Sequence, residues 1–179
     1  MKVGNTVFEV VRGSVTDQEV DAIVNAANGA MRGGGGIDGR IHRSAGSGLM
    51  MELIRVAPGG AKTGQPVVTG AHNLPQKHII HVAGPVWRGG NKGEPELLAD
   101  CYRNCLAESD KLSLASIAFC SISTGIYGYP LADAAKIAVA TAVAYVRNHA
   151  ETTLTRIVFA MYGQEEFDVF ERTVAEAAG

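Results

Sequence analysis

The residues best suited to chemistry lie in one stretch, NAANGAMRGGGGIDGRIH, at residues 25–42. Asn25 and Asn28 precede four consecutive glycines, and Asp38 and His42 follow them. An asparagine amide can orient a substrate, and a carboxylate can position or deprotonate a water molecule. Because four glycines in a row lose much conformational entropy on folding, the bare backbone between these side chains needs a physical cause.

A flexible surface loop is one explanation of the glycines, and a ligand-binding loop is the other. Helical spacing begins directly after them, so the free N–H groups of a helix start would face the space that the loop encloses. A second loop, SISTGIYGYP at residues 121–130, also follows a buried strand and offers small residues and backbone donors. Two such loops facing one crevice would clamp a diphosphate without lysine or arginine.

Two familiar phosphate-binding motifs are excluded by their context. Gly34, Gly36 and Gly39 match G-x-G-x-x-G, but the first glycine does not directly follow a strand, and residues 50–58 have helical spacing. The stretch GGAKTG at residues 59–64 resembles a P-loop, but Val56 and Ala61 stand where that motif requires glycines.

Composition predicts one domain over residues 1–179 with a single core, since 46% of the residues are hydrophobic. The 16 Lys and Arg against 18 Asp and Glu leave a net charge of -2, so no general attraction to nucleic acid or to an anionic membrane is expected. No stretch approaches the roughly 20 apolar residues of a membrane span. A cytoplasmic protein that holds any anion locally is therefore expected.

The cysteines and two histidines indicate structural roles. The three cysteines lack paired spacing, which argues for reduced thiols. Cys101 and Cys105 would lie one helical turn apart, but nothing near them completes a tetrahedral zinc site. His78 and His81 have an odd spacing that sends strand side chains to opposite faces, so packing or hydrogen-bonded roles are expected.

The elements that must position these residues alternate along the chain. Apolar runs rich in β-branched residues predict strands at residues 6–11, 22–24, 67–70, 78–82, 117–121 and 157–160. Helical spacing predicts helices at residues 39–56, 94–109, 131–149 and 165–177. This alternation indicates an α/β domain with a mostly parallel sheet, and the loops after the second and fifth predicted strands are expected to build the ligand site.

The two loops together resemble those of a macrodomain of the MacroD type. NAAN, GGGG, IDG and IH form one loop and SISTGIYGYP the other, and the similarity runs from VVRGSVT near residue 10 to the final helix, including HVAGPVWRGG at residues 81–90. The resemblance implies a three-layer α/β/α fold with a central mixed, mostly parallel sheet that binds ADP-ribose. Members of this family are similar in hydrolysing mono-ADP-ribose esters on acidic side chains of proteins and in deacetylating O-acetyl-ADP-ribose. For this chain a mechanism without metal or cofactor is expected.

The resemblance also implies residue roles. Asp38 would lie beside the scissile bond, and Asn28 would hold the distal ribose hydroxyls. Tyr127 would close over that ribose, and Tyr162 would lie beside adenine. The ligand-binding residues implied in this way are Ser14, Val15, Asn25, Gly35, Gly36, Ile37, Ser123, Thr124, Gly125, Ile126, Tyr127 and Tyr162.

One residue departs from the family pattern. The first loop of the family usually reads Gly-Asp-Ile-Thr, with the aspartate accepting a hydrogen bond from the adenine amino group, whereas residues 13–16 read Gly-Ser-Val-Thr. Ser14 cannot supply that carboxylate. Weaker adenine selection and about tenfold weaker ADP-ribose binding are expected, because a charge-assisted hydrogen bond exceeds a neutral one by about 1.4 kcal/mol. Asp17 is near enough in sequence to substitute.

Several alternatives remain open from the sequence. Asp38 could cap the following helix instead of handling water, and His42, one turn later, could support the structure or take part in catalysis. Trp87 and its neighbours could be a packing anchor or a substrate contact. The protein could be a hydrolase or a binding-only reader of ADP-ribose, since fold alone does not decide. The expected partners are ADP-ribose, O-acetyl-ADP-ribose and mono-ADP-ribosylated proteins, with nucleic acid only as an ADP-ribosylated end, and a monomer is expected.

Overall fold

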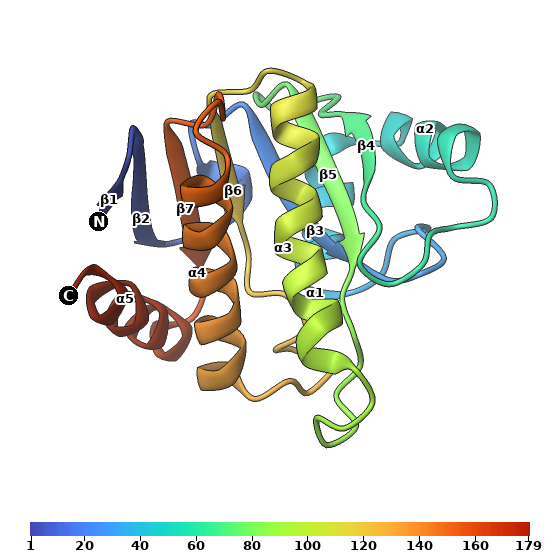
Figure 1. Cartoon of the computed structure of the whole chain (residues 1–179). Helices are drawn as coiled ribbons and strands as arrows, with labels where there is room; N and C mark the ends of the chain where they lie inside the picture. The colour runs from blue at the N-terminus through green and yellow to red at the C-terminus, as the bar shows by residue number, and fades with distance from the viewer.

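The strands of the protein form one seven-stranded sheet, described here over residues 1–179 in a computed structural model (Figure 1). Their order across the sheet is β1-β2-β7-β6-β3-β5-β4. The strands are β1 (Lys2–Val3), β2 (Thr6–Arg12), β3 (Ala22–Ala27), β4 (Val67–Gly70), β5 (His78–Ala83), β6 (Ser116–Phe119) and β7 (Arg156–Met161). Only β1 with β2 and β4 with β5 pair antiparallel, so the predicted mixed, mostly parallel sheet is confirmed.

Helices cover both faces of this sheet. They are α1 (Gly36–Ala45), α2 (Gly48–Val56), α3 (Glu94–Lys111), α4 (Leu131–Asn148) and α5 (Gln164–Ala178), and a short 3-10 helix, η1 (Val15–Asp17), follows β2. Strand side chains alternate between two apolar clusters: Val24 packs with α3, α4 and α5, and Ile23 packs with α1 and α2. The predicted three-layer α/β/α architecture is therefore confirmed. None of these helices combines the length and the apolar character needed to cross a membrane.

The prediction of a single helix over residues 39–56 is wrong, because this segment forms two helices, α1 and α2. Gly46 ends α1 with a φ of 87°, and its N–H donates to His42 O at 3.0 Å. Because a φ of 87° strains any residue that carries a Cβ, the turn favours a glycine. The helical spacing of apolar residues continues across Gly46, because Ile41 of α1 and Leu49 of α2 pack into the same apolar cluster.

The strand predicted over residues 22–24 continues to Ala27, so the first letters of the NAAN stretch still belong to β3. Asn25 pairs in register with His81 of β5, and its polar side chain is hydrogen-bonded within the sheet face, which explains how a strand accommodates it. β1 was not predicted, and β6 ends at Phe119, before the predicted limit at 121. The other boundaries differ by only a few residues.

The carboxyl ends of β3, β5, β6 and β7 meet at one edge of the sheet. After β3 the chain enters α1 on one face, whereas after β6 it enters α4 on the other. Because the two connections leave neighbouring strands in opposite directions, a crevice opens between them. This is where the two ligand loops lie.

Candidate active site

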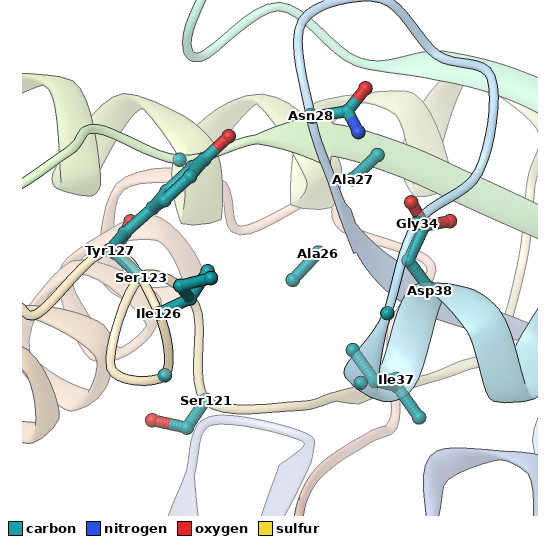
Figure 2. A pocket seen from close by; sticks show the side chains of 14 residues that line it. Ala26, Ala27, Asn28, Gly34, Ile37, Asp38, Ser121, Ser123, Ile126 and Tyr127 are labelled. Carbon is teal, nitrogen blue, oxygen red and sulfur yellow. The ribbon is translucent and has the colours of Figure 1, made fainter.

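A cleft of about 340 Å³ separates the two loops, a size typical of small-molecule sites (Figure 2). Its lining residues are Ala26, Ala27, Asn28, Gly34, Gly35, Gly36, Ile37, Asp38, Gly84, Ser121, Ser123, Gly125, Ile126 and Tyr127. Figure 2 shows Asn28 and Asp38 on one side of the cleft and the Tyr127 ring facing them from the other. The two loops therefore face one crevice, as their sequences predict.

Two runs of backbone N–H groups at the cleft donate no hydrogen bond within the protein. One run is residues 34–38, where the start of α1 leaves its first amides without an intrahelical acceptor. The other is residues 123–127 of the second loop. No lysine or arginine lines the cleft. Its capacity for an anion therefore resides in amide dipoles and in the positive end of α1.

The glycines of the first loop serve two purposes. A Cβ on Gly39 would lie 2.6 Å from Gly34 O, so this glycine lets the helix start pack against the loop. A Cβ on Gly35 would meet nothing within 4 Å, and Gly35 lines the cleft. Packing thus explains why residue 39 is a glycine. The absence of a side chain at Gly35 instead leaves space free in the cleft.

Asp38 is the third residue of α1 and is only 4% exposed. Its Oδ1 accepts a hydrogen bond from Asn25 Nδ2 at 2.8 Å and lies 3.4 Å from His42 Nε2. The interpretation of Asp38 as the helix cap is wrong, because the cap residue is Gly35 and no side chain caps α1. Burial raises the pKa of the Asp38 carboxyl, while the Asn25 hydrogen bond and the charge of His42 oppose the rise. Asp38 is therefore a stronger base than an exposed aspartate.

Asn28 is held by the backbone of its own loop. Its Nδ2 donates to Gly33 O at 3.0 Å, and its buried Oδ1 has no hydrogen-bond partner in the protein. The unpaired oxygen of this amide can accept a hydrogen bond from a hydroxyl donor that reaches its buried position. This arrangement suits a ribose better than a phosphate, because a phosphate oxygen is an acceptor.

The second loop is a tight turn stabilised by its own backbone. Tyr129 N donates to Ser123 O at 2.9 Å, and Gly128 N donates to Gly125 O at 3.0 Å. Ser123 has a φ of 67° and a buried Oγ without a partner, while Ile126 at the tip is fully exposed. Strained and unpaired groups gathered at a cleft are typical of a binding loop.

Gly84, at the end of β5, was not predicted as a site residue although it lines the cleft. A Cβ here would lie 2.2 Å from Ser123 Oγ and 2.6 Å from Ile122 Cγ2. Gly84 therefore allows the second loop to pack directly on β5. The sequence carries no local signal for this contact, since the two segments lie about forty residues apart.

Trp87 is a packing anchor, one of the two roles left open by the sequence. The Trp87 ring lies 4.6 Å from that of Tyr129, and the backbone N–H of Trp87 donates to Tyr127 O at 2.8 Å. The following turn is held by the buried carboxylate of Glu94, which was not predicted to have a role. This carboxylate accepts hydrogen bonds from the N–H groups of Arg88, Gly90 and Lys92.

Five of the predicted ligand residues do not line the cleft. Ser14 and Val15 are buried at η1, where Ser14 Oγ contacts Thr16 Oγ1 at 2.9 Å. Thr124 contacts Ser121 through their hydroxyls at 2.6 Å. The ligand contacts of these residues therefore stay predictions.

Asn25 and Tyr162 complete the set outside the cleft. Asn25 is fully buried beneath the cleft, against Asp38. Tyr162, at the end of β7, is 69% exposed, and the guanidinium of Arg40 lies 5.4 Å from its ring centroid. Ser121, Ala26, Ala27 and Gly34 line the cleft without having been predicted.

The three cysteines are buried, and none of them lines the cleft. Cys101 Sγ contacts Ala83 O at 3.6 Å, and Cys120 Sγ contacts Val24 O at 3.7 Å. Burial raises the pKa of the Cys120 thiol to about 12, which makes it a poor nucleophile. No group of three or more histidine, cysteine, aspartate or glutamate side chains is arranged to hold a metal ion.

Comparison with known proteins assigns the chain to a family. The Macro domain family matches residues 24–138. O-acetyl-ADP-ribose deacetylase of Escherichia coli (strain K12) is 44% identical over 173 residues, covering 96% of this chain and 97% of the relative. The Salmonella typhimurium protein of the same name is 45% identical, covering 94% of each chain.

Solved structures agree with the sequence relatives. The Oceanobacillus iheyensis macrodomain with ADP superimposes with a TM-score of 0.92 at 34% identity, covering 99% of this chain and 95% of that one. The Trypanosoma brucei macrodomain in complex with ADP-ribose superimposes with a TM-score of 0.86 at 40% identity, covering 93% and 68% of the two chains. The chain belongs to the macrodomain family.

Proposed function

We propose that this protein binds ADP-ribose in the cleft and hydrolyses O-acetyl-ADP-ribose to acetate and ADP-ribose. The observation that carries the proposal is the buried Asp38 carboxylate in a cleft that is also lined by residues from two runs of free backbone N–H groups. The names of the relatives and the ADP-ribose in a related structure support the same substrate. No cofactor or metal takes part in the proposed reaction.

The ligand is proposed to use the two loops for different groups. The N–H groups of residues 123–127 and the start of α1 bind the diphosphate, since they supply dipoles where no side-chain cation is present. Gly35 and Gly36 leave room for the distal ribose, whose hydroxyl donates to the free Oδ1 of Asn28. The Tyr127 ring lies on the opposite wall of the cleft (Figure 2), and its proposed role is to cover the same ribose.

In the proposed mechanism Asp38 accepts a proton from a water molecule, and the water oxygen attacks the ester carbonyl carbon. The resulting tetrahedral intermediate collapses by breaking the bond to the ribose oxygen, which takes up the proton. The ligand phosphate shares the positioning of the water, because a single carboxylate is a weak base. Asn28 orients the ribose and transfers no proton.

The same chemistry extends to ADP-ribose esters on acidic side chains of proteins, which also place an ester next to the distal ribose. We propose mono-ADP-ribosylated proteins as a second substrate class on this ground. A nucleic acid enters this scheme only through an ADP-ribosylated end. His42 lies near the Asp38 carboxylate, and its proposed role is to support that carboxylate.

The first prediction concerns Asp38→Ala. The variant is expected to lower kcat for O-acetyl-ADP-ribose about 100-fold or more, the contribution of a positioned general base. Its Kd for ADP-ribose, measured by calorimetry, is expected to change less than about threefold, because the free amides remain. Acetate release under saturating substrate gives kcat.

Asp133→Ala is the matched control, because Asp133 is the exposed third residue of α4 as Asp38 is the buried third residue of α1. This variant is expected to retain wild-type turnover. A wild-type protein that binds ADP-ribose but leaves the esters of both substrates intact is a reader module, and the hydrolase proposal then fails.

A further inference from the structure

A row of polar side chains crosses one face of the sheet and ends at the cleft. Thr69 of β4, His81 of β5, Asn25 of β3 and Asp38 of α1 follow one another and are each at most 4% exposed. His81 pairs in register with Asn25 and with Val67, two residues before Thr69, so all three strand residues share a face. The same face carries the apolar cluster under α1 and α2. Polar groups buried in such surroundings need hydrogen bonds.

The contact with Thr69 favours one of the two possible positions for the proton on the His81 ring. Thr69 Oγ1 donates its only proton to Gly70 O at 2.9 Å, and it lies 2.9 Å from His81 Nε2. With that proton directed at Gly70 O, the Thr69 oxygen can accept a hydrogen bond from Nε2, which favours the tautomer with the proton on Nε2. Burial lowers the pKa of His81 to about 3, which keeps the ring neutral. Nδ1 is then unprotonated and can only accept.

His81 in turn determines how the Asn25 amide is oriented. Asn25 Nδ2 lies 3.1 Å from His81 Nδ1 and 2.8 Å from Asp38 Oδ1, so its two protons serve two acceptors. A rotated amide would place its oxygen against both an unprotonated nitrogen and a carboxylate. The buried Oδ1 of Asn25 has no partner in the protein, which indicates that the donor side decides the orientation.

We propose that Thr69 and His81 are positioning residues for Asp38, because together they fix the Asn25 amide that holds the Asp38 carboxylate at the cleft. Neither residue lines the cleft, so both act through Asn25. The kinetic part of this inference rests on the proposed hydrolase function. A purely structural role predicts instead that activity follows stability alone.

The first test compares Thr69→Val with Thr69→Ser. Valine has the shape of threonine without the hydroxyl, so the proton on His81 is free to move to Nδ1, where it repels the Asn25 amide. Thr69→Val is expected to lower kcat about fivefold, the value of one neutral hydrogen bond, with the Kd for ADP-ribose within about twofold. Thr69→Ser restores the hydroxyl and is expected to recover most of the loss.

Thr6→Val is the matched control for stability. Thr6 is a fully buried threonine at the start of β2 that donates to Leu154 O at 2.6 Å, and it does not line the cleft. Its loss lowers the melting temperature but leaves kcat unchanged. Equal kcat in Thr69→Val and Thr6→Val at comparable melting temperatures would overturn the inference.

The second test uses His81. In His81→Asn the side-chain oxygen can accept from Asn25 where Nδ1 did, whereas His81→Leu removes the acceptor. The asparagine variant is expected to keep about fivefold more kcat than the leucine variant, again one hydrogen bond. If the two variants lose kcat equally, the acceptor at this position has no role and the inference is wrong.

A spectroscopic readout separates this inference from the proposed function. The ¹⁵N resonances of the His81 ring report its tautomer without any turnover, and protonated Nε2 with bare Nδ1 is expected in the wild type. Thr69→Val is expected to change that pattern and to shift the carboxyl ¹³C signal of Asp38. If the wild type shows no hydrolysis, only the proposed function fails, and unchanged ring and carboxyl signals in Thr69→Val then overturn the positioning inference.

Discussion

Ser14 is the residue at which this chain departs from the MacroD pattern, and its surroundings show what replaced the usual aspartate. The Ser14 Oγ accepts from Thr16 N at 3.3 Å and contacts Thr16 Oγ1, so the hydroxyl caps η1. An aspartate can cap a helix in the same way, and its second carboxylate oxygen would remain free. Ser14 therefore caps η1 with its single side-chain oxygen, whereas an aspartate would carry one further acceptor.

The effect of this residue on ligand binding is the second prediction. Ser14→Asp is expected to lower the Kd for ADP-ribose about tenfold, the difference between a charge-assisted and a neutral hydrogen bond. Ser14→Asn is the uncharged control and is expected to gain little. Calorimetry that gives the same Kd for wild type and Ser14→Asp would sink the prediction, and weaker binding by Asp17→Asn would then identify the substitute.

At the scale of elements, the site depends on how closely β5 approaches the loop after β6. Gly84 lies where a Cβ would come within 2.6 Å of two neighbouring side chains, Ser123 and Ile122. The loop after β6 is restrained from moving away from β5, because the backbone N–H of Trp87 donates a hydrogen bond to Tyr127 O in that loop. A single methyl group at Gly84 is therefore expected to deform the cleft wall.

The third prediction is the effect of Gly84→Ala. Overpacking at this contact is expected to reduce the free energy of unfolding by about 1–3 kcal/mol and to weaken ADP-ribose binding by displacing residues 123–127. Urea unfolding and calorimetry measure the two effects. Gly59→Ala is the control, since a Cβ at Gly59 meets nothing within 4 Å. Wild-type affinity in Gly84→Ala would mean that the loop does not depend on this contact.

Local patterns predicted the alternating elements and both loops, because β-branched runs and helical spacing are local properties. They did not predict the break at Gly46, since apolar residues continue across it into one cluster. Nor did they predict that Gly84 lines the cleft, because its place there depends on how the end of β5 packs against a loop about forty residues later. Asn25 was predicted to bind ligand, but the register of β3 on β5 buries it against Asp38, which only the tertiary structure reveals.

At the scale of the whole molecule, the buried polar row couples stability to pH. Burial lowers the pKa of His81 from 6.5 to about 3. Between these two pH values the unfolded chain therefore binds a proton at His81 and the folded chain does not. This contribution to stability is complete above pH 6.5 and is lost as the pH falls toward 3. The ring of His42, 6.5 Å away, adds to the effect, whereas the raised pKa of Asp38 acts in the opposite direction.

The fourth prediction follows from this sign. Between pH 6 and pH 4 the free energy of unfolding of the wild type is expected to fall more steeply than that of His81→Asn, by up to about 1.4 kcal/mol per pH unit. Urea unfolding at several pH values measures both slopes. Their difference isolates His81 from the carboxylates that the two proteins share. Parallel curves would show that His81 titrates alike in the folded and unfolded chains.

The absence of lysine and arginine from the cleft has a consequence for how the site could be lost or changed. A side-chain cation can be removed by one codon change, whereas every residue except proline carries an N–H group. An anion site made of amides therefore survives most replacements along residues 123–127, and it does not titrate. The site depends on the backbone conformation of these residues. Mutations that change this conformation are therefore expected to weaken anion binding more than mutations that change a charge.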